Sequence, residues 1–220
     1  MHLRAIRDIW RAYSAAGRDE RVRAVVRYVL CSWTGLLPHF PPKGSLLDVG
    51  CGNGLLFFLL DRAAPGARRL TGIDHDPARV EIARALRIPG AEFQAGDVAS
   101  LPAETFDTAS VIHVLYLIPP DRRREFIAQV LRALRPGGTL ILALNVTRPR
   151  WKAAVAYWQE VLMVNGLGLT KGASIAFQSL EEYAAHVEAC GATVLTARRA
   201  DRGRPYAHAV LVARKADASA

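Results

Sequence analysis

Residues 46–60 constrain the possible folds of this chain more than any other stretch. An apolar run that contains Asp48 leads into glycines at every second position, Gly50, Gly52 and Gly54, and a second apolar run follows. This order predicts a buried strand, a tight turn and a helix. Glycine permits positive φ and close approach of a ligand to the backbone, and the first N–H groups of the helix point into the same space. We therefore expect a ligand-binding turn here.

Two nucleotide-type interpretations compete for this turn, beside a glycine turn that binds nothing. A dinucleotide fingerprint requires G-x-G-x-x-G, but Leu55 stands where its last glycine would fall. Asp48 also places a carboxylate beside the loop, which suits a cationic ligand better than a pyrophosphate. The pattern D-x-G-x-G-x-G resembles motif I of the class I S-adenosylmethionine-dependent methyltransferases. Within that family the chain resembles the small-molecule type, whose domains are classed as methyltransferase domain 11/25. The resemblance implies that the loop holds the methionine part of the cofactor through Asp48, Gly50, Cys51, Gly52 and Asn53.

A second segment fits the resemblance at residues 69–74, which read as a short strand ending in an acid 20 residues after Gly54. In the family this acid accepts the ribose hydroxyls, so the resemblance implies Asp74 as the ribose ligand. His75 is then expected to line the adenosine pocket. Asp76 is the weaker ribose candidate, because it precedes Pro77 and is expected to cap the next helix.

Three further segments follow in the family's order. Residues 91–98 resemble its third strand, which implies that Asp97 accepts from the adenine amino group and that the backbone N–H of Val98 meets a ring nitrogen. The alternative for Asp97 is a local turn. Residues 106–115 resemble strand four, whose C-terminal end faces the cofactor and carries His113, and residues 134–142 resemble the turn into strand five and the strand itself.

Strand and helix patterns alternate from residue 45. Short connections between them imply an α/β fold, a doubly wound parallel sheet. The resemblance implies a Rossmann-like seven-stranded sheet with an antiparallel last strand and an N-terminal helical cap. We expect strands at 45–50, 69–74, 91–95, about 106–114, about 139–145, 192–199 and 207–215, and helices at 55–64, 77–87, about 121–135 (opened by Asp121), 151–164 and, after a capping box at 179–182, up to Gly191. Residues 166–172 read as a flexible loop.

Residues 1–40 precede this core and carry two amphipathic helical patterns split near Gly17. Ile6, Ile9, Trp10 and Tyr13 lie on one apolar face, and the pattern recurs at Val22, Val25, Val26 and Val29. In related methyltransferases such helices form a lid over the cofactor, and the alternative is a basic amphipathic helix on a membrane surface. We expect one domain, with residues 1–40 as lid and 41–220 as Rossmann-like core.

Bulk properties exclude several classes. No uncharged apolar run reaches the length of a membrane span and no signal-type apolar region opens the chain, so the default location is cytoplasmic. The three cysteines are too scattered for a disulfide framework or a metal site, so no metal is expected. The net charge of +9 comes mainly from arginines spread along the chain, without a basic tail or an aromatic-interleaved strip. Nucleic acid is therefore not the expected partner.

Methyl transfer from a sulfonium requires alignment first and a base only when the acceptor must lose a proton. His113, at the end of strand four, is the leading base candidate, and its alternative is a residue that shapes the cofactor pocket. Tyr116 follows it and can orient the acceptor, and His208 opens the last strand and can face the same cleft or merely pack. Trp151, Trp158 and Tyr157 read equally as core or lid packing and as an aromatic substrate wall.

Missing motifs argue against three acceptor classes. Residues 118–121 lack the acceptor side chain of the Asn/Asp-Pro-Pro-aromatic element, which argues against nucleic-acid amino groups. None of the cysteines follows a proline, which argues against cytosine C5, and no carboxylate cluster follows strand four, which argues against metal-dependent methylation of catechols. A small molecule with apolar or aromatic bulk remains. Residues 145–152 and 205–208 also resemble small bacterial methyltransferases encoded with aryl-polyene or lipid-like pigment pathways of secondary metabolism. This narrower resemblance implies a phenolic head group, carrier-bound or near a membrane.

Three functions of different class therefore stand: an S-adenosylmethionine-dependent methyltransferase acting on a small molecule, an RNA methyltransferase, and a non-catalytic cofactor-binding partner subunit. The intact cofactor motifs favour the enzymes, and only the net charge favours RNA. The expected assembly is a monomer or a homodimer.

Overall fold

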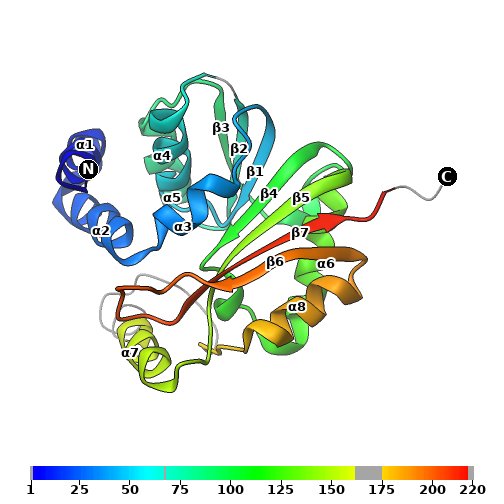
Figure 1. Ribbon diagram of the computed structural model, residues 1–220. Coiled ribbons are helices and arrows are strands. Elements are labelled where there is room, and N and C mark those ends of the chain that lie inside the picture. The colour runs from blue at the N-terminus through cyan, green and yellow to red at the C-terminus, as the bar shows by residue number, and fades with distance from the viewer. Residues whose placement is uncertain (1, 67, 162–174, 218–220) are drawn as a thin grey trace. The chain divides into compact units, whose positions relative to one another are not determined.

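The computed structural model describes residues 2–66, 68–161 and 175–217 (Figure 1). The chain divides into two compact units, residues 1–101 and 102–220. Each unit contributes strands to a seven-stranded mixed sheet of Rossmann-like type, which confirms the predicted fold class. A single domain with residues 1–40 as a lid stays a prediction.

The first unit pairs an N-terminal helical region with three strands and their helices. Its strands lie in the order β3-β2-β1 and are parallel, with Val49 of β1 beside Ile73 of β2 and Asp74 of β2 beside Ala95 of β3. The C-terminal ends of all three strands therefore meet at one edge. In chain order the elements are α1 (His2–Ala12), η1 (Ser14–Ala16), α2 (Gly17–Leu30), α3 (Trp33–Leu36), η2 (Leu37–His39), β1 (Gly44–Val49), α4 (Leu55–Ala63), β2 (Arg68–Asp74), α5 (Pro77–Ala85), β3 (Ala91–Ala95) and η3 (Val98–Ser100).

The second unit carries the other four strands, in the order β4-β5-β7-β6. β4 and β5 are parallel, while β7 is antiparallel to both β5 and β6, as expected for the last strand. The elements are β4 (Phe106–Ile112), η4 (Leu115–Leu117), η5 (Pro120–Arg122), α6 (Arg123–Ala133), β5 (Leu134–Asn145), α7 (Arg150–Val161), α8 (Leu180–Ala189), β6 (Ala192–Arg199) and β7 (His208–Lys215).

The structure corrects three element boundaries. β4 ends at Ile112, two residues early, because His113 adopts a positive φ of 55°. Asp121 does not open the following helix: it lies in η5, and α6 begins at Arg123 without a side-chain cap. β5 begins at Leu134 rather than 139, because Phe106 pairs with Leu134 and Thr108 with Thr139, so that residues 135–138 form a bulge within the strand.

The predicted helix starts are better matched. Asp76 accepts a hydrogen bond from the N–H of Ala78 and Pro77 is the first residue of α5, as the cap interpretation expected. Ser179 and Glu182 form the expected capping box of α8. α7 covers the predicted helix up to Val161, and the remainder of that helix with the predicted loop at 166–172 lies outside the described residues.

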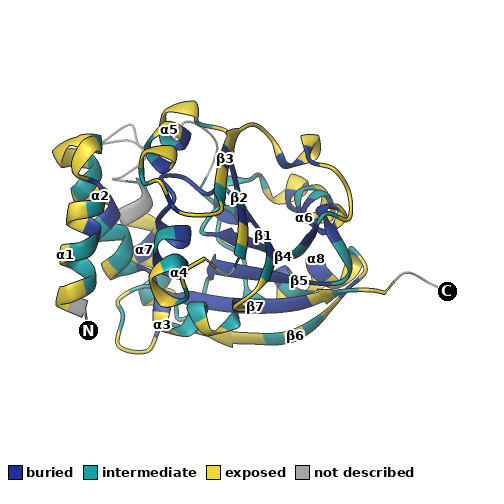
Figure 2. Ribbon diagram, turned by 90° about the horizontal axis from the view of Figure 1, so that it is seen from above, coloured by how far each residue is buried: buried dark blue, intermediate teal, exposed yellow. Residues whose placement is uncertain are grey.

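The inner strands of the sheet are more buried than its edge strands (Figure 2). β1, β7 and the second half of β5 are almost continuously buried, whereas most residues of the edge strands β3 and β6 are intermediate or exposed. α1 buries Ile9, and Tyr13 just beyond it is buried too, as the periodicity predicted, whereas Trp10 of the same predicted face is 38% exposed. The valine face of α2 is different: Ala24 is its buried residue, while Val22 and Val29 remain nearly half exposed.

Candidate cofactor and acceptor sites

The glycine turn between β1 and α4 has a left-handed backbone that suits glycine and few other residues. Gly50, Gly52 and Gly54 all have positive φ, of 75°, 53° and 81°. A Cβ at Gly54 would lie 3.1–3.2 Å from side chains of α5 and β3, and one at Gly52 would lie 3.3 Å from the Arg27 guanidinium of α2. The turn is therefore closely packed at Gly52 and Gly54 and left-handed at all three glycines, so a larger residue there would be strained.

Hydrogen bonds from the turn run to the end of β2. The N–H groups of Gly50 and Cys51 both donate to the carbonyl of Ile73, at 2.8 and 3.1 Å. The N–H of Gly52 donates to Oδ2 of Asp74 at 2.8 Å, and Oδ1 of Asp74 accepts from the N–H of Asp76 at 3.0 Å. Asp74 thus holds the turn in place, a role that its predicted ribose contact did not include. A carboxylate has about four lone-pair sites, so ribose hydroxyls can still donate to it.

Asp48 and Cys51 lie at the buried base of the turn. Asp48 is 3% exposed at the end of β1. Burial, followed by the nearby charges of Asp48 and Asp74, raises the pKa of the Cys51 thiol well above its usual range. Cys51 therefore stays protonated at neutral pH and fills space instead of acting as a nucleophile. Its sulfur also explains Gly72 on β2, where a Cβ would come within 2.9 Å of it.

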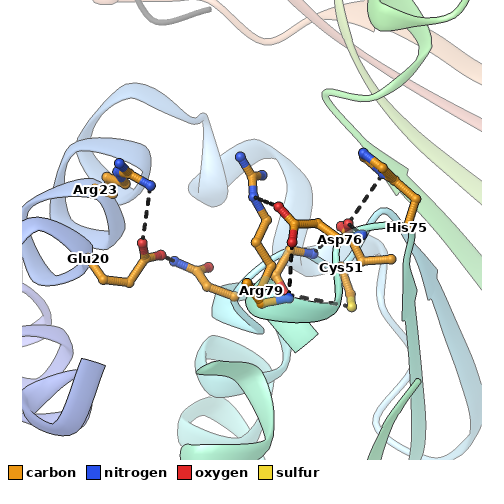
Figure 3. A network of polar contacts seen from close by, with 10 residues as sticks. Glu20, Arg23, Cys51, His75, Asp76 and Arg79 are labelled. Carbon is orange, nitrogen blue, oxygen red and sulfur yellow. Dashed lines mark hydrogen bonds and ion pairs between the residues drawn. The ribbon is translucent and has the colours of Figure 1, made fainter. Parts of the chain in front are cut away.

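Asn53 connects the turn to the N-terminal helices. Its amide nitrogen donates to Oε1 of Glu20 at 2.6 Å, and its backbone carbonyl accepts from the hydroxyl of Tyr13 at 2.9 Å. Glu20 in turn pairs with Arg23, 3.6 Å away (Figure 3). The Asn53 Oδ1 atom is buried and has no hydrogen-bond partner among the described residues. The N-terminal helices are therefore fastened to the turn and leave one acceptor atom for a ligand.

The remaining predicted cofactor residues follow β2 and β3. His75 is largely exposed, with Nδ1 3.4 Å from Oδ1 of Asp74 (Figure 3). Asp97 is exposed and accepts from the N–H of Ala99 at 2.8 Å, which is the local turn considered as its alternative. Val98 is buried. Asp97 keeps a second carboxylate oxygen for an adenine amino group, so the local bond and the predicted role are compatible.

His113, Tyr116 and His208 belong to the second unit. The His113 and His208 rings lie 4.6 Å apart between centroids, so the structure brings these two candidates together. His113 has a left-handed backbone, which is uncommon for a residue other than glycine and is enriched at functional sites. Tyr116 is buried with its ring edge-on to Phe177 at 5.5 Å, a packing contact. His208 is 7% exposed.

His208 lies next to a buried ion cluster. Asp201 accepts from Lys152 at 2.9 Å and from Arg199 at 2.6 Å. Burial raises the pKa of Asp201, but these hydrogen bonds and charges outweigh it and hold that pKa below its usual value. Burial, with smaller effects of Arg204 and Lys152, lowers the pKa of His208 to about 4. At neutral pH His208 is therefore an uncharged hydrogen-bonding group and a weak base.

Sequence reasoning missed the residues that attach the helices to the turn. The sequence pattern placed Tyr13 on an apolar helix face and gave Glu20 no role, and only their spatial meeting with Asn53 shows one. Asn145 was also missed as a site residue: it is 3% exposed, and its Oδ1 atom lacks a partner within the described part of the chain. The three aromatics of α7, Trp151, Tyr157 and Trp158, are exposed, which excludes core packing for them.

Among the described residues, no group of three or more His, Cys, Asp or Glu side chains is arranged to hold a metal ion. Within the same part of the chain, no helix has the length and apolar character needed to cross a membrane.

Comparisons with known proteins agree with this geometry. Residues 46–138 match the family model of a methyltransferase domain. The chain is 30% identical over 168 residues to 2-methyl-6-phytyl-1,4-hydroquinone methyltransferase of Synechocystis, covering 74% of this chain and 51% of that protein. It is 39% identical over 101 residues to phthiotriol/phenolphthiotriol dimycocerosates methyltransferase of Mycobacterium leprae, covering 44% and 36%. The chain thus spans about half the length, or less, of these curated relatives.

A solved structure extends the likeness of fold to nearly the whole chain. Magnesium protoporphyrin IX methyltransferase of Synechocystis, with bound SAH, superimposes with a TM-score of 0.63 over 95% of this chain and 94% of that one, at 19% identity. The chain belongs to the class I S-adenosylmethionine-dependent methyltransferase family. S-adenosylmethionine is accordingly its cofactor.

The residues of the first unit fit this cofactor. Asp48 and Asp74 supply buried negative charge beside the turn, which suits a ligand with a sulfonium and an ammonium group. The unpartnered Oδ1 of Asn53 offers a hydrogen-bond acceptor at the same place. The individual contacts of Asp48, Gly50, Cys51, Gly52, Asn53, Asp74, His75, Asp97, Val98 and His113 with the cofactor stay predictions.

Proposed function

We propose that this chain transfers the methyl group of S-adenosylmethionine to a small-molecule acceptor with a phenolic or aromatic head and lipid-like bulk. The observation that carries the proposal is the turn at Gly50–Gly54. Its Gly52 N–H donates to Asp74, and its Asn53 is hydrogen-bonded to Tyr13 and Glu20. Two relatives are named for methylating a phytyl hydroquinone and a phenolphthiotriol lipid. Their names support an acceptor of this chemistry. Because the match covers only 51% and 36% of these two relatives, the acceptor stays a proposal.

Methyl transfer requires the chain to align the acceptor with the methyl group more than it requires acid or base groups. The sulfonium makes the methyl carbon electrophilic, and an in-line displacement needs the acceptor atom held close to it. Positioning of this kind lowers a barrier by roughly 7–11 kcal/mol. A phenol with a pKa of about 10 must also lose its proton, so a nearby acceptor of that proton helps.

His113 is the residue we propose for receiving the proton. It follows the end of β4, the strand whose C-terminal end faces the cofactor in the family, and its strained backbone aims the imidazole differently from a strand residue. The weak basicity of His208 leaves it the poorer candidate for the same role. Tyr116 remains a candidate for orienting the acceptor.

The test of this role separates transfer from cofactor binding. We expect His113→Ala to lower methyl transfer about 100-fold, within the range for general base catalysis, while the Kd for S-adenosylmethionine changes less than about threefold. His186→Ala on α8, which removes a histidine bonded to Gln178 away from the ring pair, is the matched control and should retain transfer. Equal losses of transfer and cofactor affinity in His113→Ala would assign it a pocket-shaping role instead.

We further propose that α1 and α2 hold the enzyme at an anionic lipid surface, where a lipid-like acceptor resides. Leu3 and Trp10 share one exposed face of α1, and Val22 and Val29 share one exposed face of α2, since each pair is seven residues apart. Arg21 of α2 lies over the Trp10 ring at 5.5 Å, so the two faces adjoin. The exposed charged residues around them are mostly arginines, namely Arg4, Arg7, Arg11, Arg18 and Arg23.

An apolar face rimmed by cations matches a membrane whose lipids carry negative charge, and each cation near such a surface contributes about 1 kcal/mol. Sedimentation with vesicles of 30% phosphatidylglycerol in phosphatidylcholine tests this. Leu3→Glu and Val29→Glu should reduce binding at least tenfold, while Leu195→Glu, an equally exposed apolar position on the edge strand β6, should not. Equal binding to neutral vesicles, or loss in all three variants, would contradict the proposed surface.

A further inference from the structure

The end of β5 and the start of β7 place two buried polar side chains side by side in the second unit. Asn145, the last residue of β5, and His208, the first residue of β7, are register partners across the antiparallel pair. Side chains of such partners lie on the same face of the sheet. Asn145 is 3% and His208 7% exposed, so both are removed from bulk water.

Both side chains have an atom without a hydrogen-bond partner in the described ranges of the chain. These atoms are Oδ1 of Asn145 and Nδ1 of His208. Buried polar atoms are nearly always paired in native proteins, because leaving one unpaired forfeits its hydration without replacement. Two such atoms on one face, from partner positions, indicate a bound group that the described residues do not supply.

The surroundings of His208 fix its ring and keep it uncharged. Its ring lies 4.6 Å from that of His113 and is stacked on that of Tyr206 at 5.8 Å. Burial and the cations Arg204 and Lys152, opposed by Asp201, hold its pKa near 4. A neutral imidazole nitrogen either donates or accepts, whereas an amide oxygen only accepts. A hydroxyl group satisfies both, since it donates to one atom and bonds the other with its remaining capacity.

We propose that Asn145 and His208 bind a phenolic hydroxyl of the acceptor, an inference that rests on the proposed function and narrows its substrate class. A carboxylate would meet the Asn145 oxygen without a proton to donate, and an ammonium group would meet the cations beside His208. The aromatic neighbours of the pair, His113 and Tyr206, favour a ring next to the hydroxyl. Asn145 is therefore a binding residue that selects hydroxylated acceptors.

Two probes of the same shape test this selection: 4-propylphenol and its methyl ether, 4-propylanisole. Their Kd values are measured by calorimetry, with and without saturating SAH, on the whole protein. We expect the wild type to bind the phenol about tenfold more tightly than the ether, the difference typical of one buried hydrogen bond. Asn145→Leu should abolish this preference while its affinity for the ether stays within about twofold.

Two further variants test whether a lost preference for the phenol has another cause, such as unfolding or the removal of any amide. His208→Phe keeps a ring and should also lose the preference, which protects the test if Asn145→Leu unfolds. Gln178→Leu removes another amide whose oxygen is buried and unpartnered among the described residues, but whose nitrogen is bonded to His186, and it should keep the preference. An unchanged preference in Asn145→Leu and His208→Phe, loss of it in Gln178→Leu too, or a wild type that binds neither probe would overturn the inference.

The SAH titration of the same samples separates this inference from the proposed function. Wild type that fails to bind SAH contradicts the proposed function, whatever the probes do. Wild type that binds SAH but does not prefer the phenol contradicts only the assignment of Asn145 and His208.

Discussion

At the scale of single residues, Asp74 uses both oxygens of its carboxylate to hold the backbone of the cofactor site. One oxygen of its carboxylate accepts from Gly52 of the cofactor turn and the other from Asp76. The sequence motif predicted an acid at this position for the ribose, because an acid at the end of a second strand does that in nucleotide folds. The bond to Gly52 could not be predicted, since it depends on how the turn folds back over β2.

We predict that Asp74→Asn weakens S-adenosylmethionine binding about 10- to 100-fold. An amide keeps one acceptor, but it turns a donor toward one of the two backbone N–H groups and removes the charge. Calorimetric titration measures the change. Asp76→Asn is the matched control, because asparagine caps a helix as well as aspartate, so its Kd should stay within about threefold. Equal weakening in both variants would contradict the special role of Asp74.

His208 makes a second residue-scale prediction, on the pH dependence of stability. Its folded pKa of about 4 lies below the unfolded value of 6.5, so the unfolded state binds more protons between these pH values. Its stabilising contribution is complete above pH 6.5 and is lost as the pH falls toward 4, by an amount on the order of 3 kcal/mol.

Urea unfolding of wild type and His208→Phe at a series of pH values measures this contribution. Carboxylates titrate in the same window, so the difference between the two proteins is the informative quantity. We expect the free energy of unfolding to fall more steeply with acid in the wild type than in His208→Phe. Parallel curves would show that His208 titrates normally in the folded protein.

At the scale of elements, Arg123 joins segments that the sequence keeps far apart. This fully buried first residue of α6 donates from Nε to the carbonyl of Ile118 at 2.9 Å and from Nη2 to that of Ala176 at 2.5 Å. Its guanidinium also lies over the Tyr183 ring of α8. In the sequence Arg123 is one of three consecutive arginines, and no periodicity distinguishes it from its exposed neighbours.

We predict that Arg123→Met lowers the free energy of unfolding by about 2–4 kcal/mol, because it leaves two carbonyls without their donor. Arg122→Met removes an exposed arginine with a 3.8 Å contact to Glu125 and should cost less than about 0.5 kcal/mol. Chemical denaturation of both variants gives the comparison. Similar costs would show that burial of Arg123 contributes no more than a surface ion pair.

Element boundaries show where local sequence stops being informative. The strand–turn–helix at 44–63 and the caps of α5 and α8 were predictable, because apolar runs, glycine and capping residues act locally. The early start of β5 was not, because its pairing with Phe106 and the bulge at 135–138 are set by a neighbouring strand. The exposure of Val22 and Val29 was missed for the same reason, since periodicity shows a face and not what covers it.

At the scale of the whole molecule, the family assignment rests on five motifs in one order and on the seven-stranded sheet that carries them. The cofactor half of the site could be predicted from sequence, since the turn and the strand-end acids recur with fixed spacing. The acceptor half could not, because Asn145 and His208 are 63 positions apart and meet only through β5–β7 pairing. The acceptor must therefore be found by experiment.

The most direct experiment incubates the purified protein with methyl-labelled S-adenosylmethionine and a host lysate separated into small-molecule, lipid, RNA and protein fractions. We predict label in the small-molecule or lipid fraction, with at least a tenfold loss of label for Asp74→Asn at limiting cofactor. Label confined to RNA would contradict the proposed acceptor class and assign the net charge of +9 to nucleic-acid binding. Label in no fraction would contradict catalysis and leave a cofactor-binding partner subunit.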